Sequence, residues 1–340
     1  MTVRKLAIVA ALAALWSPLA ADSSQAIRLW PEIEPFETGY LRVSDVHEIY
    51  YELCGNRDGI PVIVLHGGPG GSCSPYYRRF FDPEKYFIIL HDQRGAGRSR
   101  PFAEISDNDT WKLVEDINRL RAHAGVEGKA VLFGGSWGAT LALAYAEAYP
   151  ENVSALVLRG VFTATREEID HFYHGGVGQY FPEVYDRLVN SLPEPDRKPL
   201  PQYLFELIES DDKSVRDKYA YEWARYELRI SALNFSDRDV EKFLKDYNPL
   251  AFARLENYYM SNGCFMEEGQ LLRDAGRLEN MRVIMVNGRY DVVCPPVTAY
   301  RLHEMLPGSK LVLAEGSGHW MGEPKIQAAL LEAMRDLEDL

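Results

Sequence analysis

The sequence has few cysteines and no cluster of positive charge. Only four cysteines occur in 340 residues, at Cys54, Cys73, Cys264 and Cys294, and their spacing matches no zinc-binding pattern. Export would permit disulfides in any of three pairings, but we favour independent buried thiols in a chain of this length. The formal net charge is -13, and no run of Lys or Arg interrupts the acidic balance. Because an acidic surface repels nucleic acid and anionic membranes, we expect neither as a partner.

The N-terminal segment is too short to span a membrane. Arg4 and Lys5 precede an uninterrupted apolar run of eleven residues, Leu6 to Trp16, and small residues follow it. A bilayer span needs about 20 apolar residues, whereas this pattern is typical of a cleaved secretory leader. We therefore predict a leader over residues 1–20, a periplasmic or secreted mature protein, and no stable membrane anchor. A stray apolar helix on a cytosolic enzyme is the alternative.

From about residue 40 the sequence alternates short apolar strands with longer helical patterns. Strands are predicted at 62–65, 87–90, 130–133, 155–158, 283–286 and 311–313, and helices at 113–124, 139–149 and 326–337. Strands without polar alternation, interleaved with helices, indicate a mostly parallel central sheet with helices on both faces. The sequence does not indicate the oligomeric state.

The amino-acid composition and the periodicity of the sequence change near Thr163. Residues 163–260 are rich in aromatic side chains, Glu and Arg, and their periodicity is helical, with several prolines but no obvious strand. We interpret this stretch as a helical cap inserted into an α/β core. The core then consists of residues 27–162 and 261–340.

A strand-to-helix turn presents a candidate nucleophile, Ser136. It lies in Gly134-Gly135-Ser136-Trp137-Gly138, directly after a predicted strand and before a predicted helix. This G-x-S-x-G turn exposes a serine Oγ at the top of an α/β-hydrolase sheet. Because a serine hydroxyl is a poor nucleophile until a base takes its proton, the chain must also supply a base.

The base and its partner acid are expected after the last strands, in the chain order Ser, acid, His. His319 and Asp291 follow the last two predicted strands. We expect His319 to deprotonate Ser136 and Asp291 to orient the imidazole. The backbone N–H groups of Trp137 and of Gly68, in the glycine-rich loop after strand 62–65, would form the oxyanion hole. This chemistry needs no metal or organic cofactor.

Two glutamates of the predicted cap, Glu227 and Glu256, lie among aromatic and aliphatic residues. A glutamate on a helix is most often solvated or paired with a neighbour four residues away. The alternative is that both bind a substrate ammonium group, because a buried carboxylate needs a cationic partner.

Seven co-linear motifs carry a family resemblance. They are HGGPGG at 66–71, FFDPEKY at 80–86, DQRGAGRS at 92–99, GGSWGATLALAYA at 134–146, ARLENYY at 253–259, GRYDVVCPP at 288–296 and GSGHW at 316–320. With them the chain resembles the prolyl aminopeptidases (proline iminopeptidases) of the α/β-hydrolase superfamily over roughly residues 35–335. The resemblance implies a serine exopeptidase that releases N-terminal proline from short peptides.

The resemblance also implies roles for individual residues. Ser136, Asp291 and His319 take the positions of the catalytic triad. Glu227 and Glu256 fall where the family binds the substrate's amino group. Phe162 and Phe172 fall near aromatic positions of the family's proline pocket. Cys294 follows the loop of Asp291 and is expected close to the site. The family is mostly cytoplasmic, which is the alternative to export.

Two other functions remain open at this stage. One is a capped esterase or amidase without selectivity for a free amino end. The other is a hydrolase-fold binding protein without activity, against which the complete set of Ser136, Asp291 and His319 argues.

Overall fold

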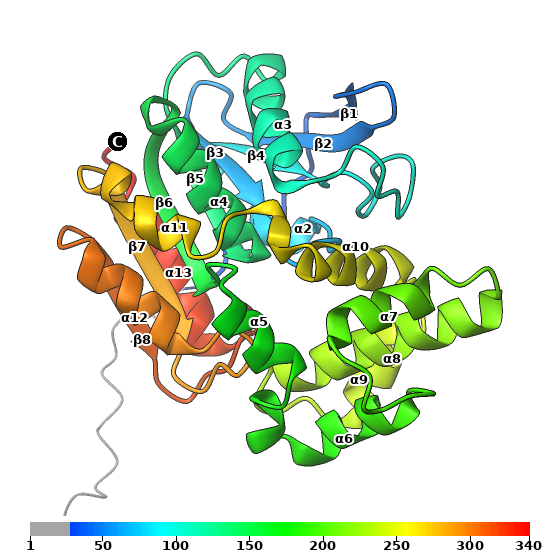
Figure 1. Cartoon of the computed structure of the whole chain (residues 1–340). Helices are drawn as coiled ribbons and strands as arrows, with labels where there is room; N and C mark the ends of the chain where they lie inside the picture. The colour runs from blue at the N-terminus through cyan, green and yellow to red at the C-terminus, as the bar shows by residue number, and fades with distance from the viewer. Residues whose placement is uncertain (1–27) are drawn as a thin grey trace, which may run out of the picture.

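The computed structural model describes residues 28–340 (Figure 1). The predicted leader at 1–20 lies outside them and stays a prediction. Eight strands form one sheet in the order β1-β2-β4-β3-β5-β6-β7-β8. The strands are β1 Glu37–Arg42, β2 Glu48–Gly55, β3 Ile60–Leu65, β4 Tyr86–His91, β5 Ala130–Ser136, β6 Val153–Val161, β7 Arg282–Gly288 and β8 Lys310–Ala314. No helix within 28–340 is long and apolar enough to cross a membrane.

The strands from β3 to β8 run parallel, whereas β1 and β2 pair antiparallel at one edge. Sequence analysis missed these two strands. Side chains of β1 alternate between partly buried and exposed, so the strand lacks the continuous apolar run that marks β3 or β4. The mostly parallel sheet that the sequence predicts is otherwise confirmed.

Some helices cover the two faces of the sheet and others lie beside it. They are α2 Pro75–Arg78, α3 Thr110–His123, α4 Trp137–Ala148, α5 Arg166–Tyr173, α6 Pro182–Ser191, α7 Leu200–Ile208, α8 Lys213–Ser231, α9 Asp237–Leu244, α10 Leu250–Ser261, α11 Gln270–Asp274, α12 Pro296–Met305 and α13 Pro324–Arg335. Ile63 and Leu65 of β3 pack in the core on the side of α3, α4 and α12. Val62 and Val64 pack with α13 on the other side. Because both faces are buried, the strand shows no polar alternation.

The segment between β6 and β7 holds helices α5 to α11 and no strand among the residues described (Figure 1). Helices α5 to α10 lie beside the sheet, and α7, α8 and α10 pack against one another. The predicted cap, 163–260, corresponds to this segment, although its limits as a domain stay a prediction. Helix α5 begins with a capping box of Thr165 and Glu168. Glu168 also accepts a 2.9 Å hydrogen bond from Thr298 of α12, which ties the first cap helix to the core.

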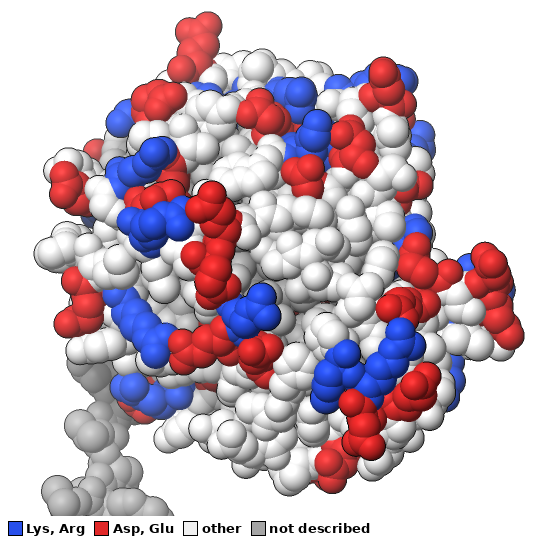
Figure 2. Space-filling view, viewed as in Figure 1, with Lys and Arg blue, Asp and Glu red and all other residues white. Residues whose placement is uncertain are grey.

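The surface charges are mixed. On the face in Figure 2, blue Lys and Arg side chains lie among red Asp and Glu side chains. Several form ion pairs, such as Arg301 with Glu167 at 2.8 Å. All four cysteines are buried and unpaired, as the sequence predicts.

Candidate active site

Ser136 ends β5 and precedes the first residue of α4 in a strained turn. Its φ of 57° and ψ of -126° are values that side-chain-bearing residues rarely adopt. Two glycines permit the turn. A Cβ at Gly134 would lie 2.2 Å from the carbonyl oxygen of Gly138, and a Cβ at Gly138 would lie 2.0 Å from that of Leu65. The strand and the helix can therefore pass this closely only without side chains at these two positions.

Asp291 and His319 meet beyond the ends of β7 and β8. His319 Nδ1 lies 2.8 Å from Asp291 Oδ2. Asp291 Oδ1 accepts hydrogen bonds from the backbone amides of Val293 at 3.0 Å and Cys294 at 2.8 Å. Because a carboxylate only accepts hydrogen bonds, Nδ1 of His319 carries the proton. The other ring nitrogen, Nε2, is then unprotonated and can accept a hydrogen bond or a proton.

Nε2 of His319 faces Arg159 at the end of β6. The guanidinium Nη1 lies 2.8 Å from Nε2 and donates to the His319 carbonyl oxygen at 3.0 Å. Within 28–340 no hydrogen bond joins His319 to Ser136, so the direct contact that the sequence predicts is not present in this conformation. To act as the base, His319 must exchange Arg159 for the Ser136 hydroxyl.

Sequence analysis missed Arg159. The signal was present, because a cation that directly follows a buried apolar strand, 155–158, is seldom buried unless it has a partner. Burial lowers the pKa of His319 below its ordinary value of 6.5; Asp291 opposes this, and the charge of Arg159 adds to it. Arg159 therefore bears on the protonation of the base.

An Arg159→Gln variant should shift the pH dependence of hydrolysis. Removing the charge raises the pKa of His319, and the base must be neutral to act. The acidic limb of kcat/KM should thus move to higher pH. We would measure it with a short acyl ester, which carries no amine. Arg301→Gln, which removes an exposed arginine, is the control, and an unmoved limb in Arg159→Gln would contradict the role of Arg159.

The predicted oxyanion donors lie on both sides of Ser136. Trp137 is the first residue of α4, and its indole donates a 2.9 Å hydrogen bond to Gln93 Oε1. Gly68 has a φ of 114° in the loop after β3. The assignment of the two backbone N–H groups to an oxyanion hole stays a prediction.

A small cavity of about 20 Å³ lies against Ser136. The predicted site residues that line it are Gly68, Ser136, Phe162, Phe172, Glu256 and Cys294. Ser136 Oγ lies 3.9 Å from the Cys294 thiol. Burial raises the pKa of this thiol well above its ordinary value, which keeps it protonated and a poor nucleophile. The structure thus gathers residues from both parts of the core and from the cap.

Glu227 and Glu256 form a buried pair of carboxyl groups next to this cavity. They are only 9% and 3% exposed, which excludes the solvated alternative. Burial raises the pKa of Glu227 to about 7. Burial and the charge of Glu227 raise the pKa of Glu256 well above its ordinary value. Each carboxyl group acts on the pKa of the other, and because two neighbouring carboxylates repel each other, the pair resists losing its last proton near neutral pH.

Aromatic side chains surround the pair, and sequence analysis predicted Phe172 among them but missed Trp223 and Tyr173. Trp223 donates a 2.7 Å hydrogen bond from its indole to Glu256 Oε2. The ring of Tyr173 stacks on Trp223 at 4.7 Å, and Phe172 meets Trp223 edge to face at 5.5 Å. The spacing held a signal, because Trp223 precedes Glu227 by four residues on α8 and therefore shares its face.

Comparison with known proteins first identifies the fold family of the chain. The alpha/beta hydrolase fold family model matches residues 60–325. The chain therefore has the α/β-hydrolase fold that the sequence predicts. Solved structures agree, including an esterase from Exiguobacterium antarcticum (TM-score 0.61, 22% identity, 89% of this chain and 100% of that chain). Another is a proline iminopeptidase-related protein from Thermus thermophilus (TM-score 0.56, 21% identity, 88% and 96%).

Curated relatives narrow the assignment. A proline iminopeptidase of Xylella fastidiosa (strain Temecula1) is 46% identical over 304 residues, which cover 89% of this chain and 97% of the relative. One of Xanthomonas citri is 46% identical, covering 90% and 97%, and one of Arabidopsis thaliana is 42% identical, covering 92% and 82%. The chain belongs to the proline iminopeptidase family, which confirms the resemblance identified from its motifs.

Proposed function

We propose that this protein is a prolyl aminopeptidase, a serine exopeptidase that releases N-terminal proline from short peptides. The observation that carries the proposal is the buried pair Glu227 and Glu256, with Glu256 lining the same cavity as Ser136. A carboxylate at such a site is stabilised by a cation, and the amino end of a peptide is one. The names of the relatives support the same substrate class.

In the proposed reaction, Ser136 Oγ attacks the carbonyl carbon of the first residue while its proton passes to His319 Nε2. The resulting oxyanion accepts hydrogen bonds from the N–H groups of Gly68 and Trp137. The C–N bond then breaks, and His319 returns the proton to the departing amine. Water then attacks the prolyl ester of Ser136 while His319 accepts a proton from the water. His319 returns this proton to Ser136 Oγ as proline leaves.

The amino end of the substrate is selected by the acid pair. In our proposal the ammonium group of the first residue pairs with the acid pair, and the proton that the raised pKa values keep on the pair is released to solvent. Two buried polar atoms support this placement, because among the described residues Glu227 Oε2 and Tyr173 Oη have no hydrogen-bond partner. An N-acylated peptide has no ammonium group and would leave the pair without a cation, so it should be rejected.

The small cavity supports a compact first residue. Phe162, Phe172 and Cys294 line it, and its volume of about 20 Å³ is close to the space that a single water needs. The proline ring therefore enters only as these side chains or the cap move. Selectivity for proline then arises because a larger first residue would require a larger displacement.

Four substrates test the proposal on the purified protein. They are a proline arylamide, its N-acetyl form, an alanine arylamide and a short acyl ester. We expect kcat/KM for the free proline arylamide to exceed that for the acetylated form by about 10²-fold or more. The acetylated form has no ammonium group, so its binding would leave the buried carboxylate charge without a cation. Equal or faster turnover of the acetylated compound or the ester would favour the esterase or amidase alternative. Inert protein in all four assays would favour the binding protein.

A further inference from the structure

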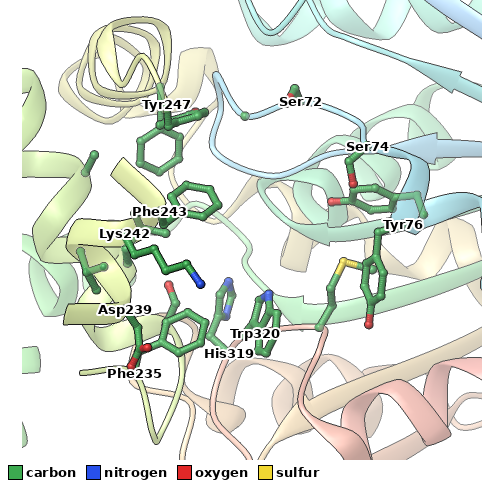
Figure 3. Close-up of a pocket in the computed structure, with 18 of the residues that line it drawn as sticks. Ser72, Ser74, Tyr76, Phe235, Asp239, Lys242, Phe243, Tyr247, His319 and Trp320 are labelled. Carbon is green, nitrogen blue, oxygen red and sulfur yellow. The ribbon is translucent and has the colours of Figure 1, made fainter. Parts of the chain in front are cut away.

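A second, larger cavity of about 680 Å³ opens beside His319 (Figure 3). It lies between the cap helices α8 and α9 and two core segments, the loop 71–77 and the stretch 319–321. It shares no lining residue with the small cavity at Ser136. The two cavities therefore divide the site, one with the nucleophile and the other with the base.

The chemistry assigns one side of a substrate to each cavity. His319 has to reach the departing amine to protonate it, so the chain that leaves lies on the side of His319. The acyl part lies with Ser136, Gly68 and the acid pair. If the proposed aminopeptidase function holds, the larger cavity receives the peptide that follows the N-terminal proline. A volume of this size is in the range of sites for small ligands, about 300–1,000 Å³.

The walls of the larger cavity are rich in aromatic rings. Phe235 packs against Trp320 with ring centroids 5.1 Å apart, and Phe243 packs against Tyr247 at 5.3 Å. Phe243 and Trp320 are 55% and 44% exposed, so apolar surface faces solvent at this site. Apolar side chains of a leaving peptide would cover it.

One unpaired cation faces the cavity from the cap. Lys242, on α9, directs its amine into the cavity in Figure 3. The carboxylate of Asp239, one turn earlier, accepts hydrogen bonds from the amide and hydroxyl of Ser236. Arg159, the other cation of the lining, is bonded to His319. Within residues 28–340 Lys242 forms no ion pair, and the nearby charge that it acts on is that of Asp239, whose pKa it helps to lower.

We propose that the larger cavity binds the leaving dipeptide of a tripeptide substrate, and that Lys242 pairs with its C-terminal carboxylate. The two leaving residues span about 7 Å when extended, and their apolar side chains lie on the aromatic walls. The substrate class is thus short apolar peptides with a free C-terminus, cleaved after N-terminal proline.

The test compares Pro-Phe-Phe with its C-terminal amide. The wild-type protein should cleave the free acid about three- to fivefold faster in kcat/KM, as one partly exposed ion pair provides. Lys242→Met should bring this ratio close to 1 while keeping the apolar stem of the side chain. Lys242→Glu should invert the ratio. Lys245→Met, an exposed position on the same segment, should keep the wild-type ratio.

A second variant tests the aromatic wall. Phe243→Ala should lower kcat/KM for Pro-Phe-Phe about three- to tenfold through lost apolar contact, and it should leave Pro-Gly-Gly nearly unchanged. A wild-type ratio of 1 for acid over amide, or an unaltered ratio in Lys242→Met, would overturn this proposal. Failure of the wild-type protein to cleave the proline arylamide would instead overturn the aminopeptidase function itself, so the two failures are distinguishable.

Discussion

Replacement of Ser136 with alanine is expected to lower kcat for a proline arylamide by about 10⁵-fold or more, as removal of a serine nucleophile does in other hydrolases. Alanine keeps the Cβ that the strained turn already accommodates, so the fold should persist. Activity is measured at saturating substrate. Melting temperature and circular dichroism show whether the variant is folded.

The neighbouring thiol provides the control for this experiment. Cys294 Sγ lies 3.9 Å from Ser136 Oγ and is the other side chain there that could attack a carbonyl. Cys294→Ala should lose no more than about tenfold, because burial raises the pKa of the thiol and keeps it neutral. A loss of activity in Cys294→Ala together with retention in Ser136→Ala would identify the thiol as the nucleophile.

Because a nucleophile and its base act as one unit, their losses should not add. The double variant Ser136→Ala with His319→Gln should be no slower than Ser136→Ala alone. Additive losses would mean that His319, which faces Arg159 in this structure, does not serve Ser136.

Glu256→Gln is expected to have the second largest effect. It should lower kcat/KM for a free proline arylamide by about 10²–10³-fold, the cost of breaking one partner of a buried ion pair. The short acyl ester makes no ammonium contact and should lose far less. The amide that replaces the carboxyl group retains an oxygen that can accept the Trp223 indole hydrogen bond, so the pocket should keep its shape.

The same variant should make the protein more stable at alkaline pH. Burial raises the folded-state pKa of Glu256 well above its ordinary value of 4.5. Below 4.5 the group is protonated in both states and costs nothing. As pH rises above that value, the unfolded chain ionises while the folded chain resists, and the free energy of unfolding falls. We expect Glu256→Gln to melt about 2–4 °C above the wild type at pH 8, with little difference at pH 4.

A matched control lies on the same helix as Glu227. Glu222 is partly exposed and pairs with Arg187 at 3.4 Å, so Glu222→Gln should change activity by less than about twofold and melting by less than about 1 °C. Equal losses on arylamide and ester in Glu256→Gln would mean that the glutamate supports the fold rather than the amine.

The parts of this protein that could be predicted from sequence are those with local causes. The strand-turn-helix around Ser136 needs small residues where backbones meet, so glycines at 134 and 138 mark it. Buried parallel strands such as β3 read as continuous apolar runs. The antiparallel strands β1, at the sheet edge, and β2, beside it, escaped prediction because neither is a continuous apolar run.

Contacts between distant segments were decided only by the tertiary structure. The interaction of Arg159 with His319 joins positions 160 residues apart, and the pKa values of Glu227 and Glu256 are raised because two cap helices bury both groups together. The division of the site into a small cavity and a large one depends likewise on how the cap lies on the core. The sequence by itself determined the fold and predicted the nucleophile, because apolar runs and local backbone geometry encode them. Protonation states and cavity shape came from packing, because burial and charge are properties of the assembled chain.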